Sequence, residues 1–292
     1  MEGPHDDVLH RTPCVQEGLG SSPAQKHQRV SFLPQPEVAI IERSWDTTSK
    51  MSEQRYQIFQ GSEVTNEMLV EAAKLFTDNY GIWGEQSPRS GKRVTLNASR
   101  LRNDYLPDHA STSYVRVVVD GNLAGNAIAC RWNYDGKTIC WITQLVVGKD
   151  YRERGLATGM LRSLRIAADD MYGIITSHPA ACLAAASTFG TTIEKVPLDF
   201  IVTNAESVMK ASPISYIQNA KLCGSLFNEE DLTGMVSGVN TEFFVDHQEP
   251  LDALASVQEY WDWPLGGLPD GHEYLLLMQG KSRRSSSRSS RH

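Results

Sequence analysis

The chain has 292 residues, of which 40% are hydrophobic and 22% charged, as in ordinary globular proteins. Its formal net charge is −7, but residues 281–292 contain five Lys or Arg and no acid, so the rest of the chain carries −12. An acidic body argues against nucleic acid as a partner, and the chain has no run of roughly 18 apolar residues that would predict a membrane span.

The spacing of the cysteines and the composition of the first 20 residues indicate the cellular compartment. The five cysteines are scattered and form no Cys-x-x-Cys pair, so we expect neither a disulfide framework nor a bound metal. The first 20 residues contain acids and Pro and lack the apolar stretch of a secretory signal. We therefore expect a cytoplasmic protein in a reducing compartment, with the nucleus as the alternative, and we leave the oligomeric state open.

Composition divides the chain into three parts. Residues 1–54 are rich in Pro, Ser, Gln and charges and sustain no period, which predicts a disordered N-terminal arm with at most a short strand at 38–41. Residues 281–292 are predicted to be a basic Ser/Arg-rich tail. We expect residues 55–280 to fold as one domain with an enlarged C-terminal portion.

Hydrophobic periodicity predicts the first elements of this domain. An amphipathic helix over 66–79, with Thr65 as its N-cap, is followed by a short helix over 98–105. Two Asp-Gly turn signals join three β-rich runs, which predicts an antiparallel meander. The three strands of the meander are 113–119, 123–133 and 138–147.

A helix–strand–helix run is predicted after the meander. It consists of a helix over 156–170, a strand over 173–176 and a helix over 180–188 that Pro179 opens. The crossover helix makes the third strand of the meander and the strand 173–176 a parallel pair, so the fold class is α/β with a mixed sheet. Less regular elements follow: helical stretches in 207–226, strands over 242–245 and 274–278, and a helix over 250–260.

The stretch between the third strand and the next helix has the features of an anion site. The first N–H groups of a helix have no partner within it, and the helix dipole adds partial positive charge there. Gly155 and Ala157 keep this surface small, while Lys149, Arg152 and Arg154 add full positive charges. These features predict a pyrophosphate site; the alternative is an ordinary strand–turn–helix that binds nothing.

The same stretch resembles a known family. The signature R/Q-x-x-G-x-G/A of the GCN5-related N-acetyltransferase (GNAT) superfamily is matched by Arg152-Glu153-Arg154-Gly155-Leu156-Ala157. The strand end Leu145-Val146-Val147 is similar to the L-x-V of that family, and the order of elements over about 57–200 agrees with it. The resemblance implies a GNAT-like fold, with a mixed, mostly antiparallel sheet, splayed central parallel strands and flanking helices.

The resemblance also implies an activity. It is that of an acetyl-CoA-dependent N-acetyltransferase, which moves an acetyl group to a primary amine of a small molecule or peptide by direct attack on the thioester, without a metal. The alternative is a non-catalytic acyl-CoA-binding or scaffold protein. The residues implied to bind the cofactor are Leu145, Val146, Val147, Arg152, Glu153, Arg154, Gly155, Leu156, Ala157 and Thr158.

Two catalytic groups that are common in the family are missing here. The motif strand, predicted over 138–147, reads Trp141-Ile142-Thr143-Gln144 before Leu145 and has no Glu. The helix that Pro179 opens has no Tyr. Our catalytic candidates are therefore Gln144, which can order a water but takes a proton poorly, and His178, at a strand end beside the cofactor slot that the splayed strands would leave between them. A helix-entry role is the alternative for His178, and proximity alone is the alternative to acid–base catalysis.

Other chemistry-bearing side chains have simpler interpretations. Cys182 is either a nucleophile near a helix N-terminus or a buried thiol. Residues 80–84 are either an acceptor-binding loop or ordinary packing. Four aromatic residues are expected in the core, with an acceptor pocket as the alternative; they are Trp132, Tyr134, Trp141 and Tyr151.

Overall fold

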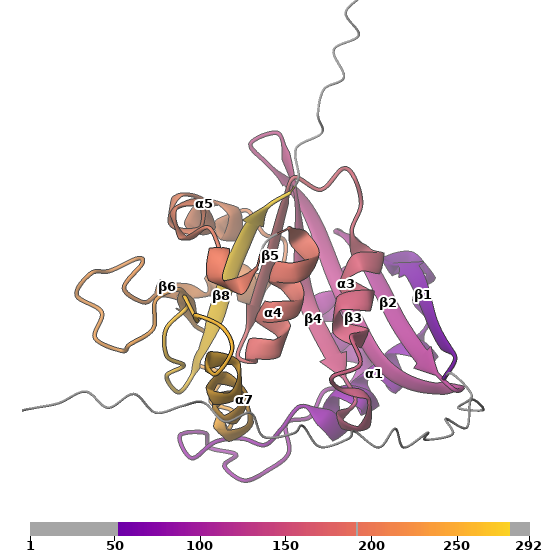
Figure 1. Ribbon diagram of the computed structural model, residues 1–292. Helices are drawn as coiled ribbons and strands as arrows, with labels where there is room; N and C mark the ends of the chain where they lie inside the picture. The colour runs from indigo at the N-terminus through magenta and orange to yellow at the C-terminus, as the bar shows by residue number, and fades with distance from the viewer. Residues whose placement is uncertain (1–51, 191, 281–292) are drawn as a thin grey trace, which may run out of the picture. The chain divides into compact units, whose positions relative to one another are not determined.

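A single sheet is the framework of the molecule. The structure, a computed structural model, describes residues 52–190 and 192–280. Within these residues eight strands form one mixed sheet in the order β1-β2-β3-β4-β5-β8-β7-β6 (Figure 1). The strands are β1 (Gln54–Gln60), β2 (Ser111–Val119), β3 (Asn122–Tyr134), β4 (Lys137–Val147), β5 (Met171–Thr176), β6 (Lys221–Cys223), β7 (Gly238–Asn240) and β8 (His272–Gln279).

Helices connect the strands and cover the sheet. The α-helices are α1 (Asn66–Asn79), α2 (Ala98–Arg100), α3 (Leu156–Leu164), α4 (Pro179–Phe189), α5 (Leu198–Lys210), α6 (Ser215–Asn219) and α7 (Gln248–Gln258). Three 3₁₀-helices are η1 (Gly61–Glu63), η3 (Lys149–Tyr151) and η4 (Ile193–Lys195), and η2 (Leu101–Tyr105) is a short π-helix. In the part of the chain that the structure describes, no helix combines the length and the apolar character needed to cross a membrane.

The predicted meander is confirmed. β2, β3 and β4 pair antiparallel in sequence order. Both connecting turns have positive φ angles at two successive residues, at Asp120 and Gly121 and at Asp135 and Gly136. Type I′ turns require this backbone, and Asp-Gly adopts it at low cost, so the sequence at the turns decides the hairpins.

Several predictions of elements were wrong or incomplete: α5 begins at Leu198, before the helical stretches predicted in 207–226, and β6 and β7 were not predicted. The helix that begins at Leu156 ends at Leu164 and not at 170, because Arg165 is already extended. No strand forms over 242–245, where Val245 makes a single bridge with Trp83. β1, the edge strand that pairs with β2, was not predicted, because it directly follows the polar arm. The strand predicted at 38–41 and the tail 281–292 lie outside the described residues.

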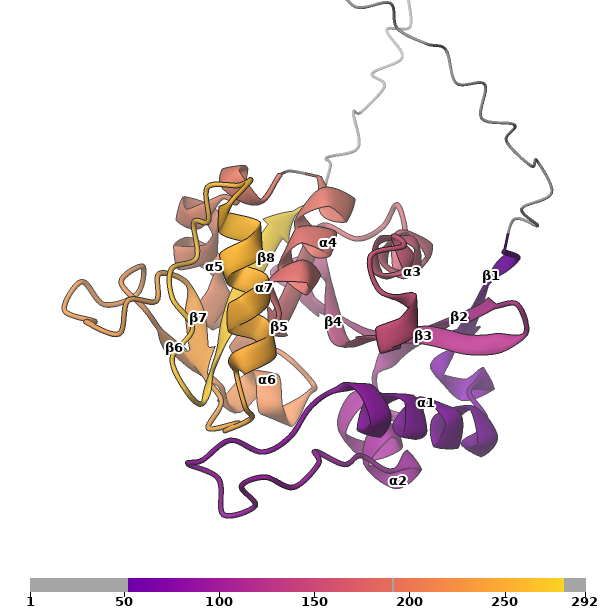
Figure 2. The ribbon, with the colours of Figure 1, turned by 60° about the horizontal axis from the view of Figure 1, so that its bottom comes forward.

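The sheet is covered on both faces. Figure 2 shows α3 and α4 on one side and α1, α2 and α6 on the other. On the first side, Leu156 and Met160 of α3 belong to the main core. On the second side, Leu69 of α1 packs with Tyr114 of β2 and Ile128 of β3. The strands therefore separate a helical layer formed by α3 and α4 from a layer formed by α1, α2 and α6.

A buried ion pair ties the sheet to the loop after α3. Arg131 of β3 donates from Nε to Oδ1 of Asp169 at 2.8 Å and from an Nη to Oδ2 at 3.1 Å. The side chain of Arg131 is 8% exposed and that of Asp169 is 0% exposed. Arg131 also donates to the hydroxyl oxygen of Ser113 at 3.1 Å and to the carbonyl oxygen of Leu164. This network satisfies the carbonyl at the C-terminal end of α3.

The central parallel strands separate toward their C-terminal ends. β4 and β5 pair from Ile139 and Met171 to Ile142 and Ile174, and no further. At this point β4 also contains a β-bulge, because Thr143 is an extra residue between the positions that pair with β3. The edge of β4 that faces β5 beyond Ile142 consequently has no strand partner. The gap between β4 and β5 beyond these residues is called the slot below, and residues at the ends of both strands line one cavity.

Candidate functional site

The loop between β4 and α3 has an unusual backbone. Glu153 and Gly155 have φ angles of +61° and +73°, in the left-handed region. Gly155 is the N-cap of α3, and a left-handed conformation costs a non-glycine residue about 1–2 kcal/mol. Such loops turn successive N–H groups toward one concave side, as in anion-binding nests. The local sequence therefore builds a surface of N–H donors.

These donors are available to a ligand. Within the described ranges, the N–H groups of residues 153–158 have no protein acceptor. The first N–H group of α3 that has one belongs to Gly159, which donates to the carbonyl oxygen of Gly155 at 2.9 Å. Residues 153–155 are exposed, whereas the side chain of Leu156 is buried in the core and anchors the loop. The macrodipole of α3 adds positive potential at the same place.

A carboxylate from α7 lies beside this loop. Glu249 forms an ion pair with Arg152, and its Oε2 lies 3.2 Å from Nζ of Lys149. The guanidinium of Arg152 also donates to the carbonyl oxygen of Asn79 at 3.1 Å. Burial opposes ionisation of Glu249, but the hydrogen bonds and charges of Arg152 and Lys149 prevail and lower its pKa. Two cations of the predicted pyrophosphate site thus share one ionised carboxylate, which leaves a net positive charge.

His178 has the helix-entry role. Its Nδ1 accepts the N–H group of Ala180 at 3.2 Å, so His178 caps α4. Its Nε2 lies 3.8 Å from Oε1 of Glu249, which places both residues near the end of the slot. Burial and the charge of Arg152 lower the pKa of His178, so the ring is neutral at pH 7. Because Nδ1 accepts this hydrogen bond, it carries no proton, and the proton of the neutral ring is on Nε2.

A cavity of about 500 Å³ lies at the splay, on the side of the sheet that α1 covers. β4 contributes one wall with a run that includes Thr143 and Gln144, and β5 contributes a second. The remaining walls come from α1, α2, η2, α6, β8, the segment between β7 and α7 and the segments that flank η2 and α6. The lining residues that the argument uses are Tyr80, Tyr105, Gln144, Tyr216, Phe243 and Glu273.

Gln144 faces this cavity with an unsatisfied amide. Its side chain is 7% exposed, and neither its Oε1 nor its Nε2 has a hydrogen-bond partner among the described residues. Asn126, diagonal to it on β3, is fully buried and equally unpaired. Buried amides in proteins are normally hydrogen-bonded, so these two groups indicate a bound water or ligand. The role of Gln144 in ordering a water stays a prediction.

Sequence reasoning missed the carboxyl group in the cavity. Glu273 of β8 lines it, about 130 positions after Gln144 in the chain. Burial raises the pKa of Glu273 to about 7, although a hydrogen bond with Thr241 opposes the shift. The Tyr216 hydroxyl donates to the carbonyl oxygen of Thr143 at 3.1 Å and closes the wall beside the bulge. The resemblance led us to look for a Glu on the motif strand, which is β4, whereas Glu273 belongs to β8.

The comparisons with known proteins decide the family. Residues 72–186, which include the meander, the motif loop and α4, match the model of the family described as Acetyltransferase (GNAT) family. Over residues 72–186 the chain is therefore similar to the GNAT acetyltransferases. A search of curated proteins gave no match. The resemblance seen in the motif and in the order of elements is thus confirmed.

Solved structures of GNAT proteins are similar to parts of the chain. A glucosamine N-acetyltransferase region of a fungal multi-domain β-N-acetylglucosaminidase is 14% identical, with 42% of this chain and 14% of that chain covered and a TM-score of 0.33. The ribosomal-protein-alanine N-acetyltransferase of Brucella melitensis is 20% identical (38% and 69% covered, TM-score 0.27). The ribosomal-protein-S18-alanine N-acetyltransferase of Escherichia coli is 13% identical (47% and 77% covered, TM-score 0.32).

The remaining candidates of this GNAT protein mostly belong to the core. Trp132 and Trp141 are buried and stack with their ring centroids 5.8 Å apart, and Tyr134 and Tyr151 pack against the same core. Cys182 is fully buried, and burial raises the pKa of its thiol, so it is the inert thiol of the two alternatives. Of residues 80–84, Tyr80 lines the cavity, and the role of this segment in binding an acceptor stays a prediction.

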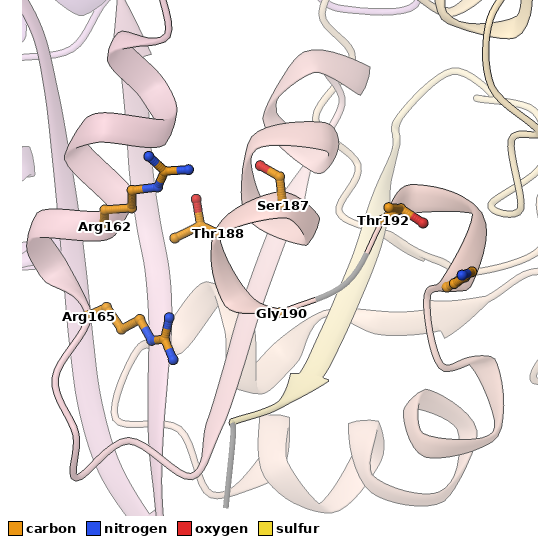
Figure 3. A pocket seen from close by; sticks show the side chains of 7 residues that line it. Arg162, Arg165, Ser187, Thr188, Gly190 and Thr192 are labelled. Carbon is orange, nitrogen blue, oxygen red and sulfur yellow. The ribbon is translucent and has the colours of Figure 1, made fainter.

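A second cavity, of about 620 Å³, lies at the other end of α3 (Figure 3). Its lining includes Arg162 in the last turn of α3, Arg165 directly after that helix, and Ser187 and Thr188 at the end of α4. None of the residues that the GNAT motif implies lies there. Among residues 52–190 and 192–280, moreover, no three His, Cys, Asp or Glu side chains are grouped so that they could hold a metal ion.

Proposed function

We propose that the protein is an acetyl-CoA-dependent N-acetyltransferase that moves the acetyl group to a primary amine of a small molecule or peptide. The observation that carries this proposal is the slot between β4 and β5, with free N–H groups at one end and a cavity at the other. A non-catalytic protein would need the donors but not the cavity.

The diphosphate of CoA would lie on the amides of residues 153–158, where Arg152 and Arg154 add positive charge. The pantetheine arm would follow the unpaired edge of β4 past Leu145 and Val147. A strand rises about 3.3 Å per residue, so the path from the motif loop to Thr143 is about 16 Å, a length that the extended arm can bridge.

The reaction itself would take place beside the β-bulge. A backbone N–H group near Val146 would polarise the thioester carbonyl and stabilise the oxyanion that forms. Gln144, with its unpaired buried amide, would hold a water or the acceptor, and His178 would position the N-terminus of α4 at the slot. Placing the amine against the thioester in a closed cavity supplies much of the rate enhancement.

Two measurements test the proposal. Titration calorimetry with CoA should show binding, and acetyl-CoA with a panel of polyamines, amino sugars and basic peptides should release free thiol. Binding without thiol release for any amine would favour the acyl-CoA-binding scaffold. No binding by folded protein would contradict both functions and leave the loop as an ordinary strand–turn–helix.

A further inference from the structure

A carboxyl group from the far half of the chain reaches the reaction cavity. β8 pairs antiparallel with β5, and Tyr274 lies opposite Thr176, the last residue of β5. Glu273 therefore lies at the end of β5, where the slot is open. We infer that Glu273 is the general base that takes a proton from the acceptor amine. This inference rests on the proposed function, since it concerns the same cavity.

The surroundings of Glu273 leave its charge unmatched. Within the described ranges no Lys, Arg or His nitrogen lies within 4 Å of its carboxylate. The groups that face it are phenols from three elements, Tyr80 after α1, Tyr105 in η2 and Tyr216 in α6. Burial and the negative charge of Glu273 both raise the pKa of Tyr80 and Tyr216, so these phenols stay neutral at pH 7.

The other charged groups of the cavity do not neutralise Glu273. Arg100 pairs with Asp104 at 3.3 Å, and both side chains remain exposed to solvent. His109 also lines the cavity and is exposed. An unmatched carboxylate in a cavity walled by phenols favours a cationic ligand, and a protonated primary amine is one.

The acidity of Glu273 suits the role. Burial raises the pKa of its carboxyl group to about 7, so an appreciable fraction is ionised at neutral pH. A general base works best when its pKa lies near the working pH. Gln144 cannot take a proton, and the lone pair on Nδ1 of His178 already accepts from Ala180. Glu273 is therefore better suited than either sequence-predicted candidate.

Removal of a proton from the acceptor precedes attack on the thioester. The ammonium group gives one proton to the Glu273 carboxylate, which passes it to water. The neutral nitrogen then attacks the thioester carbon, a C–N bond forms, and the carbonyl becomes an oxyanion. As the carbonyl re-forms, the C–S bond breaks, and the sulfur of CoA receives the second proton of the nitrogen. The products are the amide, the free thiol of CoA and one proton in solution.

The first test compares two neutralising variants. With the alkylamine that gives the highest thiol release, Glu273→Gln should lower kcat/KM by about 100-fold or more while the Kd for CoA stays unchanged. Glu242→Gln removes an exposed carboxylate from the neighbouring segment and should match the wild-type rate. Equal rates for the wild type and Glu273→Gln would overturn the inference and leave the proposed function intact.

The second test separates proton removal from structure. A hydrazide acceptor is neutral near pH 7.5 and needs no base, so Glu273→Gln should use it within about threefold of the wild-type rate. With the alkylamine, the loss should shrink as the pH rises toward the pKa of the amine. A loss that is equal for both acceptors and at every pH would contradict the role of Glu273. Wild-type protein that binds CoA but acetylates nothing would overturn the proposed function as well.

Discussion

The carboxylate of Glu249 on α7 forms an ion pair with the guanidinium of Arg152 in the motif loop, 97 positions earlier in the chain. The same carboxylate binds Lys149 and lies near His178, so it connects the two sides of the slot. If the diphosphate of CoA binds at this loop, as we propose, the carboxylate of Glu249 would compete with it for the same cations. We therefore expect the strength of cofactor binding to depend on α7 as well as on the motif.

Glu249→Gln should bind CoA more tightly. Removing one charge near Arg152 and Lys149 corresponds to about 1 kcal/mol for a solvated pair, or about fivefold in Kd, and the gain should shrink at high salt. Titration calorimetry measures it. Glu259→Gln, an exposed residue at the end of the same helix, should leave the Kd unchanged. Weaker binding by Glu249→Gln would show that Glu249 holds Arg152 in its binding position.

Gly155→Glu should abolish CoA binding, because it places a carboxylate and its bulk beside the free amides. No protein atom lies within 4 Å of a Cβ at this position, so the side chain meets no steric clash, although the positive φ strains any residue other than glycine. Gly155→Ala is the matched control for backbone strain. It should lose about 1–2 kcal/mol of stability from the positive φ and keep its CoA affinity within a few fold. Unchanged affinity in Gly155→Glu would place the diphosphate elsewhere.

Asp169→Ala should lower the free energy of unfolding by about 3–5 kcal/mol, because it leaves the Arg131 guanidinium buried without its carboxylate. Urea denaturation followed by tryptophan fluorescence measures the change. The exposed pair of Lys210 and Glu206 on α5 serves as a control, and Glu206→Ala should keep the wild-type midpoint. A similar midpoint for Asp169→Ala would mean that water replaces the lost carboxylate.

The cap on α4 should make stability depend on pH. Since the pKa of His178 is lowered in the folded protein, the unfolded chain binds the proton first as the pH falls below about 6.5. Stability from the cap is therefore full above about pH 6.5 and is lost as the pH falls through the folded pKa. His178→Asn keeps a capping side chain that does not titrate. Its free energy of unfolding should fall less than that of the wild type between about pH 7 and 5. Burial also lowers the pKa of His247, but His247 is present in both proteins and contributes equally to the pH dependence of both. The expectation would be contradicted if the free energies of unfolding of the two proteins changed equally with pH.

The sequence by itself determined the local elements and the motif loop. Asp-Gly pairs fix the two hairpins, and a glycine before an amphipathic run predicts a helix whose first N–H groups are free. Such features depend on neighbours within a few positions, so periodicity and turn chemistry reveal them. The edge strand β1 escaped prediction because its alternation merges with the polar segment before it.

Only the tertiary structure decided what surrounds the slot. Glu273 becomes a cavity residue because β8 inserts beside β5, about 100 positions after that strand, and Glu249 meets Arg152 because α7 packs near α4. Sequence reasoning searched for a carboxylate on the motif strand, where spacing could indicate it. Pairing between distant strands follows from burial and hydrogen bonding over the whole sheet, and no local pattern records which side chains it brings together.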